Sequence, residues 1–186
     1  MIELSEQKLD SRFMSSTSNT PGKFSVPFED NWAPEQRASL VMMVRNDNML
    51  LIHKKRGLGI GKILGPGGRQ EPGESMEQCA KRELKEELCI DSGPLRLAGV
   101  NRFQFADGLS LEVHIYFGES FEGMPTETAE ASPVWYPLGQ LPYDKMWPDD
   151  EIWIPLMLQN RYFEGDWLFD HESLIDFTLR RVDETA

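Results

Sequence analysis

The sequence has few of the features that mark secreted, membrane-spanning or zinc-binding proteins. Only two cysteines occur in 186 residues, Cys79 and Cys89, and no Cys or His spacing is typical of a zinc site or a disulfide framework. No run approaches the roughly 20 apolar residues that a membrane helix needs, and the N-terminus lacks a basic start followed by an apolar stretch. We therefore expect a soluble, cytoplasmic protein with no membrane partner, in which both cysteines are small buried side chains.

Basic residues are also scarce, because 19 Lys and Arg stand against 31 Asp and Glu, for a formal net charge of −12. Such a charge repels a nucleic-acid backbone and leaves no basic stripe, which excludes a duplex nucleic acid as partner. A polyphosphate can bind only where metal ions or local cations offset the carboxylates. Coiled-coil heptads are absent from the sequence too, so we expect a monomer.

The chain divides into a polar N-terminal segment and one domain. Residues 1–37 are rich in Ser, Thr, Pro, Asn and charge, which predicts a flexible extension. Four apolar side chains in this extension offer a way to dock part of it: Phe24, Val26, Phe28 and Trp32. Residues 38–186, within a chain that is 40% hydrophobic, are long enough for one domain with a real core.

Within this domain strand patterns outnumber helical ones. Hairpins are predicted over 38–53, around Asn46-Asp47-Asn48, over 95–117, around Ala106-Asp107-Gly108, and over 162–182. Residues 135–138 are typical of a short strand, and Pro148 introduces a second helix through residue 158. The stretch 57–73 holds seven glycines and two prolines, which predicts a loop. The class is mixed α/β.

The strongest helical pattern covers residues 75–88. Apolar side chains recur at every fourth position, at Met76, Ala80, Leu84 and Leu88. Ser75, followed three residues later by Gln78, is typical of a capping box at the start of a helix.

Three carboxylates, Glu83, Glu86 and Glu87, share the face of this helix that is not apolar. Clustered hard oxygen ligands suit Mg²⁺, which prefers carboxylates, waters and substrate phosphates. From the helix alone, a solvated face with basic partners is the alternative interpretation. Upstream, Gly67-Gly68 can bring backbone close to a ligand, and Arg82 can hold Glu74 or another ligand carboxylate through a two-pronged contact.

These residues resemble the signature of a known family. Gly68, five residues, Glu74, seven residues, Arg82-Glu83-Leu84, one residue, Glu86-Glu87, one residue, then Cys89-Ile90 is similar to the Nudix box, G-x5-E-x7-R-E-U-x-E-E-x-G-U, where U is aliphatic. Only Cys89 departs from the pattern, standing where the box has a helix C-terminal Gly.

The resemblance implies an α/β/α sandwich on a mixed β-sheet and the attack of an activated water on phosphorus. It implies Mg²⁺, with Mn²⁺ as a substitute, at the backbone carbonyl of Gly67 and at Glu83, Glu86, Glu87 and Glu130. The catalytic set that it implies is Glu74, Arg82, Glu83, Glu86, Glu87 and Glu130; which carboxylate is the general base stays open.

From Ser39 to Val182 the chain also looks like the MutT-homologue branch that converts oxidised purine nucleoside triphosphates, such as 8-oxo-dGTP or 2-hydroxy-dATP, to the monophosphate and pyrophosphate. The motifs are Lys54-Lys55-Arg56-Gly57, Trp147-Pro148-Asp149-Asp150 and Asp176-Phe177-Thr178-Leu179-Arg180. This likeness implies a nucleotide substrate, sanitation of the nucleotide pool and thereby avoidance of DNA damage. The substrate contacts that it implies are Ser39, Lys54, Leu58, Leu64, Gly67, Gly68, Phe103, Trp147, Asp149 and Asp150.

Several residues depart from that branch. Leu64 stands in place of an Asn that contacts the oxidised base, Leu58 in place of an aromatic residue, Ile63 in place of a Trp and Ser39 in place of a Thr. The preferred base therefore stays open, as does hydrolysis of another nucleoside diphosphate derivative (a nucleotide sugar, a dinucleotide or capped RNA) or silent nucleotide binding. Without the likeness, Asp149-Asp150 would be a helix N-cap followed by a first-turn acid.

Overall fold

The computed structural model describes residues 25–182, so Phe24 of the predicted extension lies outside the described part. Nine strands form one mixed sheet in the order β11-β10-β6-β7-β1-β2-β3, with β4 paired to β1 and β9 paired to β2. The β1–β7 and β10–β6 pairs are parallel, and the other pairs are antiparallel. No helix in the range 25–182 is long and apolar enough to cross a membrane.

The elements have the following bounds. The strands of the large sheet are β1 (Gln36–Arg45), β2 (Asn48–Lys54), β3 (Ile63–Leu64), β4 (Gly67–Arg69), β6 (Arg96–Phe105), β7 (Ser110–Gly118), β9 (Ala131–Pro137), β10 (Tyr162–Asp170) and β11 (Ser173–Val182). β5 (Asp91–Ser92) and β8 (Phe121–Glu122) form a separate pair. The helices are α1 (Met76–Leu88), η2 (Leu138–Gln140), η3 (Tyr143–Lys145) and α2 (Asp150–Leu158).

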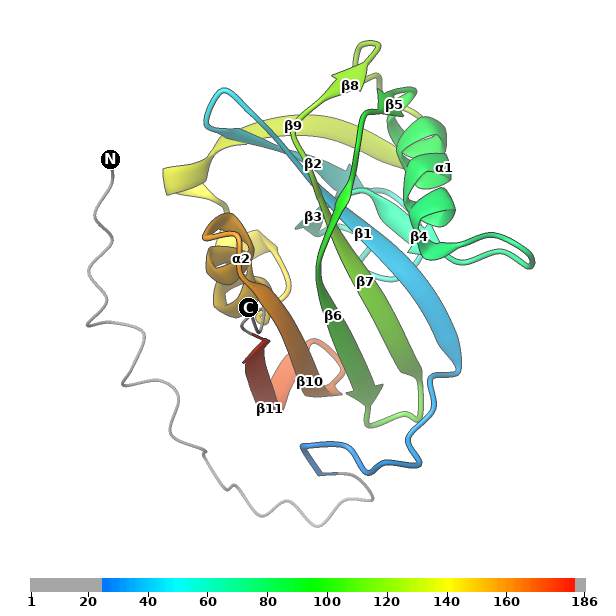
Figure 1. Ribbon diagram of the computed structural model, residues 1–186, viewed down its shortest axis with the longest axis vertical. Helices are drawn as coiled ribbons and strands as arrows, with labels where there is room; N and C mark the ends of the chain where they lie inside the picture. Colours follow the sequence, from blue (N-terminus) through cyan, green and yellow to red (C-terminus); the bar gives the residue numbers. More distant parts are fainter. Residues whose placement is uncertain (1–24, 183–186) are drawn as a thin grey trace.

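The two longer helices cover opposite faces of the large sheet, as Figure 1 shows. Successive side chains of a strand point to opposite faces, so Val41 and Met43 of β1 pack in the core under α1, whereas Met42 packs in the core on the α2 side. Each face thus has its own apolar core. The arrangement confirms the expected α/β/α sandwich on a mixed sheet.

All three predicted hairpins form. The first turns at Asn46 and Asp47, whose φ values of 50° and 58° lie in the left-handed region that Asn and Asp tolerate. Stretch 57–73 departs from the prediction of a plain loop, because its backbone pairs as β3 and β4. β9 is also longer than the predicted strand at residues 135–138, because it runs antiparallel to the whole of β2.

Helix α1 begins and ends on identifiable signals. Ser75 and Gln78 form the predicted capping box, with Gln78 N donating to Ser75 Oγ at 3.2 Å and Ser75 N donating to Gln78 Oε1 at 2.7 Å. Cys89 closes the helix with φ 59°, the left-handed conformation that the Nudix box assigns to Gly. Cys79 is buried as expected, but Cys89 is exposed because it lies at this helix end, so that part of the expectation was wrong.

Residues 25–35, part of the predicted extension, lie against the sheet. The rings of Phe28 and Trp32 stack at 5.2 Å, and Trp32 Nε1 donates to Gln104 Oε1 of β6 at 3.1 Å. The backbone N–H of Phe28 donates to Asp166 Oδ2 of β10 at 3.3 Å. Two of the four apolar residues singled out for docking therefore do dock, and the flexibility of the extension stays a prediction.

Candidate active site

Gly67 and Gly68, here called the glycine strip, form a stretch of backbone without side chains between β1 and α1. They pair with Leu40 and Ser39, and a Cβ at Gly67 would collide with the carbonyl oxygen of Ser39. A Cβ at Gly68 would collide with the carboxylate of Glu83, which reaches from α1 to this strip. Only glycine allows the strand and the acidic helix to approach so closely.

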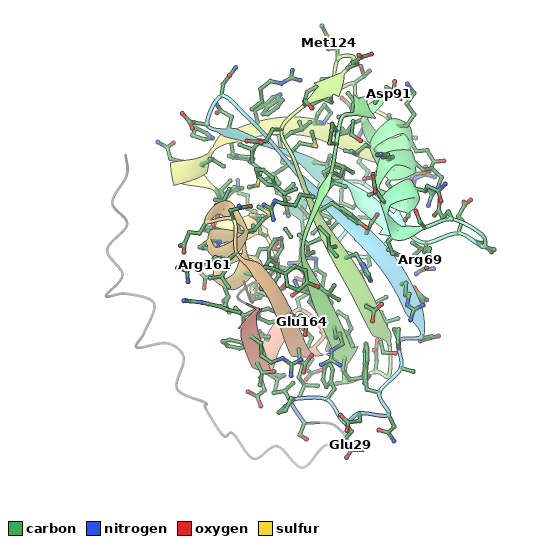
Figure 2. The ribbon with its side chains drawn as sticks, viewed as in Figure 1. Glu29, Arg69, Asp91, Met124, Arg161 and Glu164 are labelled. Carbon is green, nitrogen blue, oxygen red and sulfur yellow. The ribbon has the colours of Figure 1, made fainter. Side chains whose placement is uncertain are left out.

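Arg82 joins the acidic residues of the box into one network. Its guanidinium grips Glu74 with two prongs, Nε to Oε2 at 3.1 Å and Nη2 to Oε1 at 2.8 Å, which confirms the predicted contact. Nη1 donates to Glu83 Oε1 and to Glu86 Oε2, each at 2.9 Å. A further bond from Nη2 reaches the carbonyl of Arg69, which Figure 2 labels beside the first turn of α1.

This network sets the charge state of its carboxyl groups. The Arg82 hydrogen bonds lower the pKa of Glu74 to about 2, so Glu74 is ionised at any physiological pH. Burial raises the pKa of Glu83, although Arg82 opposes that shift. In turn Glu74 raises the pKa of Arg82, which keeps the guanidinium charged.

Glu87 is fully buried and is held by Lys54 and Gly67. Lys54 Nζ donates to Glu87 Oε1 at 2.6 Å, and the backbone N–H of Gly67 donates to Glu87 Oε2 at 2.9 Å. The same ammonium lies 3.4 Å from the carbonyl oxygen of Gly67. A cation therefore already contacts two of the five groups predicted to bind the metal.

The predicted metal ligands fit a hard divalent ion chemically, since all of them offer oxygen. As they stand, however, each carboxylate is paired with a side-chain cation: Glu83 and Glu86 with Arg82, Glu87 with Lys54, and Glu130 with Arg56 at 2.5 Å. Among residues 25–182 no three His, Cys, Asp or Glu side chains converge on one point. Metal binding would thus require exchange of these side-chain cations for the ion.

A cavity of about 410 Å³ opens beside the glycine strip. It includes every residue predicted to bind substrate, and it also includes Glu130. These residues are Ser39, Lys54, Leu58, Leu64, Gly67, Gly68, Phe103, Trp147, Asp149 and Asp150. Glu74, Arg82, Glu83, Glu86 and Glu87 do not line it and lie behind the glycine strip or further along α1.

Asp149 and Asp150 are buried at the start of α2, with 2% and 4% of their surfaces exposed. Asp149 is at the N-cap position of α2, but neither side chain makes a cap hydrogen bond: Asp149 Oδ2 accepts from Trp153 Nε1 at 3.0 Å, and Asp150 Oδ2 accepts from the backbone N–H of Trp147 at 3.1 Å. Burial raises the pKa of Asp149 to about 7 and that of Asp150 well above its ordinary value. The pair therefore retains protons near neutral pH, as a group that must both donate and accept would.

Aromatic and aliphatic side chains make up most of the remaining wall. Trp147 meets Phe105 and Phe169 edge to face, at 6.2 and 5.5 Å, and Lys62 Nζ lies 4.9 Å from the centre of a Trp147 ring. Phe103 stacks on Trp167 at 6.4 Å. Leu58 and Leu64 make one side of the wall aliphatic, as predicted from their differences from the MutT-homologue branch.

Several lining residues were not among the predicted site residues, and three of them come close to the chemistry of the pocket: Asn101, Trp153 and Phe169. Asn101 carried a detectable signal, since it is a lone polar residue in phase with Phe103 and Phe105 on one strand. Trp153 and Phe169 gave no such signal, because aromatic residues in a helix or strand are ordinarily part of the core.

Comparison with known proteins agrees with this geometry. Residues 34–157 match the NUDIX domain model. The chain is 40% identical over 147 residues to the oxidized purine nucleoside triphosphate hydrolase of Mus musculus, covering 78% of this chain and 94% of that protein. It is 38% identical over 148 residues to the Danio rerio protein of the same name, covering 78% and 95%. Among solved structures, the MutT protein from Bacillus halodurans superimposes with a TM-score of 0.69 at 25% identity, covering 77% of this chain and 97% of that one.

Proposed function

The chain belongs to the NUDIX family, and on this basis we propose that it hydrolyses oxidised or modified purine nucleoside triphosphates, such as 8-oxo-dGTP or 2-hydroxy-dATP, to the monophosphate and pyrophosphate. One observation carries the proposal: a single cavity reaches from the glycine strip beside the acidic helix to the buried Asp149-Asp150 pair. A cavity that joins a polyphosphate site to a base pocket fits a nucleoside triphosphate. The names of the mouse and zebrafish relatives support the same substrate class.

NUDIX hydrolases use divalent metal ions, and here we propose Mg²⁺, with Mn²⁺ as a substitute. The ion would be held by the backbone carbonyl of Gly67 and by the carboxylates of Glu83, Glu86, Glu87 and Glu130. The ammonium of Lys54 already contacts two of these groups, the Gly67 carbonyl and Glu87, which supports a cation at this position. When bound, the ion neutralises phosphate charge and lowers the pKa of a water molecule that attacks phosphorus.

The protein's own residues position the reactants. Arg82 fixes Glu74 and holds Glu83 and Glu86 in orientation, which keeps three carboxylates of α1 and its preceding loop in one network. Lys54 lines the cavity, where its ammonium offers charge to the phosphate chain. Gly67 and Gly68 let the carboxylate of Glu83 lie close to the backbone that borders the cavity.

The base would lie in the aromatic and aliphatic part of the cavity. Trp147 and Phe103 offer ring faces, and Asp149-Asp150 offer a carboxyl pair that can donate as well as accept hydrogen bonds. Ser39, Leu58 and Leu64 complete the wall. The monomeric state and the cytoplasmic location stay predictions.

The test is release of pyrophosphate from 8-oxo-dGTP, 2-hydroxy-dATP, O6-methyl-dGTP, N6-methyl-dATP, dGTP and dATP, with Mg²⁺ and with chelator. We expect metal-dependent turnover that favours a modified purine, and Glu83→Gln and Glu87→Gln should each lower kcat at least about a hundredfold. Glu77→Gln is the matched control, since Glu77 is exposed on the same helix and pairs only with Lys81 in the described contacts. Weak, unselective release across the panel would contradict the proposed substrate class.

A further inference from the structure

Asn101 is a buried amide in the wall of the cavity with no hydrogen-bond partner among residues 25–182. The residue is 0% exposed, and neither Nδ2 nor Oδ1 has a hydrogen-bond partner among the described residues. An unpaired buried amide is costly, since both its donor and its acceptor lose water without replacement. Such a cost is common where a ligand, and not the fold, supplies the partner.

The position of Asn101 on β6 directs it to the cavity. It lies in phase with Phe103 and Phe105, which also line the cavity, whereas Arg102 and Gln104 on the other face contact residues 25–35. Its register partner on β7 is Val113, also in the cavity wall. The amide is therefore a polar group set among apolar wall residues.

Gly165 makes the space that the amide oxygen of Asn101 occupies. This glycine is the register partner of Asn101 on β10, and a Cβ there would clash with both Asn101 Oδ1 and Trp167 Nε1. The torsion that turns an Asn amide is soft, so the amide can turn toward a molecule in the cavity that Asn101 lines. Asp149 Oδ1, likewise buried and unpartnered in the described chain, lines the same cavity from α2.

We propose that Asn101 is a specificity-determining residue whose amide hydrogen-bonds the oxidised edge of a purine base. The inference rests on the proposed function and deepens it. An 8-oxopurine presents a C8=O acceptor beside an N7–H donor, and a primary amide offers the complementary donor and acceptor together. An unmodified purine has C8–H and a bare N7, so it satisfies only the amide donor.

This assignment also explains how the cavity could recognise an oxidised base although Leu64 lines it. A leucine can form no hydrogen bond with a base, and Leu58 beside it adds none. Asn101 supplies a polar contact from a different strand, β6, so the cavity retains a group able to distinguish an oxidised base. Sites built to pair a polar group discriminate strongly because the analogue leaves that group unpaired.

The experiment compares wild type with Asn101→Leu, which keeps a similar shape and removes both hydrogen-bonding groups. We expect the ratio of kcat/KM for 8-oxo-dGTP over dGTP, and for 8-oxo-dATP over dATP, to fall at least about tenfold. Val113→Ala is the matched control, because it disturbs the same wall without removing a polar group and should lower both members of each pair alike. Ratios within twofold of wild type in Asn101→Leu would overturn the proposal.

Two further measurements keep the outcomes distinct. Binding of 8-oxo-dGMP and dGMP, measured by calorimetry without turnover, tests Asn101 even if no triphosphate is hydrolysed: a preference for 8-oxo-dGMP that Asn101→Leu abolishes supports it, and equal binding by wild type overturns it. Thermal unfolding tests for a structural role. We expect the Tm of Asn101→Leu to be unchanged or higher, since an unpaired amide is removed. A lower Tm with an unchanged base preference would show that the amide supports the fold.

Discussion

At the scale of single residues, the buried aspartates show how surroundings change the role of an ordinary motif. Asp149 and Asp150 stand where a helix N-cap and a first-turn acid are common, yet their carboxylates bond to Trp153 and to the backbone of Trp147. Burial raises both pKa values, that of Asp149 to about 7. Asp149 can therefore offer a proton to a base below neutral pH and only accept one above it.

This shift predicts a pH-dependent choice between bases. The N1 of adenine accepts a hydrogen bond and needs a protonated carboxyl group, whereas the N1–H of guanine donates and pairs with a carboxylate. The ratio of kcat/KM for 8-oxo-dATP over 8-oxo-dGTP should therefore fall as pH rises through about 7. Steady-state kinetics from pH 6 to 8.5 measure the ratio, in which the pH dependence of the chemical step cancels.

Asp149→Asn is the control for this profile, because an amide does not titrate in this range. Its ratio should lose the change near pH 7 that the titration of Asp149 causes, whatever its absolute turnover. A flat ratio in the wild-type protein would show that the aspartate pair does not read the base through its protons.

At the scale of elements, the end of α1 carries a local strain. Cys89 adopts φ 59°, and an L residue with a Cβ is disfavoured there by roughly 1 kcal/mol relative to Gly. The last turn of the helix nevertheless keeps its backbone hydrogen bond, with Cys89 N donating to the carbonyl of Lys85 at 3.0 Å. The end of the helix is therefore set by its packing and not by this residue.

Cys89→Gly should stabilise the protein. We expect about 1 kcal/mol in the free energy of unfolding, which corresponds to a rise in Tm of about 2–4 °C for a chain of this size. Thermal unfolding measures it. Cys89→Ala keeps the Cβ and should give no gain, so an equal rise in both variants would point to the thiol and not to the backbone.

At the scale of the whole molecule, the segment before β1 belongs to the fold. Phe28 is 8% exposed, and its stack with Trp32 covers Arg102, whose guanidinium lies 5.8 Å from the Phe28 ring and pairs with Asp166 at 2.6 Å. Figure 2 labels Glu29 within this segment, at the end of the large sheet. These contacts brace β6 and β10 on the face opposite Asn101 and Phe103.

Removing residues 1–35 should therefore destabilise the protein by about 2 kcal/mol, the scale of exposing one large apolar side chain. Removing residues 1–24 is the matched control, since every described contact of Phe28 and Trp32 is kept. Urea unfolding of both truncated proteins gives the comparison. Equal stabilities would mean that the aromatic segment contributes nothing to the fold.

The spacing of residues along the chain was enough to predict the acidic helix, its capping box, the three hairpins and the contact of Arg82 with Glu74. These depend on residues close in sequence, where periodicity and turn chemistry act directly. The likeness to the Nudix box added the sandwich fold. The short strands β3 and β4 escaped prediction because a glycine-rich stretch has no side-chain pattern, and its pairing with β1 and β2 depends on backbone approach.

Only the tertiary structure determined which partners the charged and polar side chains have and how deeply they are buried. The pairing of Lys54 with Glu87 joins β2 to α1, and the burial of Asp149 comes from packing around α2. The unpartnered amide of Asn101 arises from the register of β6 with β7 and β10, which places Gly165 beside it. Burial and partnership depend on residues distant in sequence, so no local pattern encodes them, and they set the pKa values and contacts that a substrate would meet.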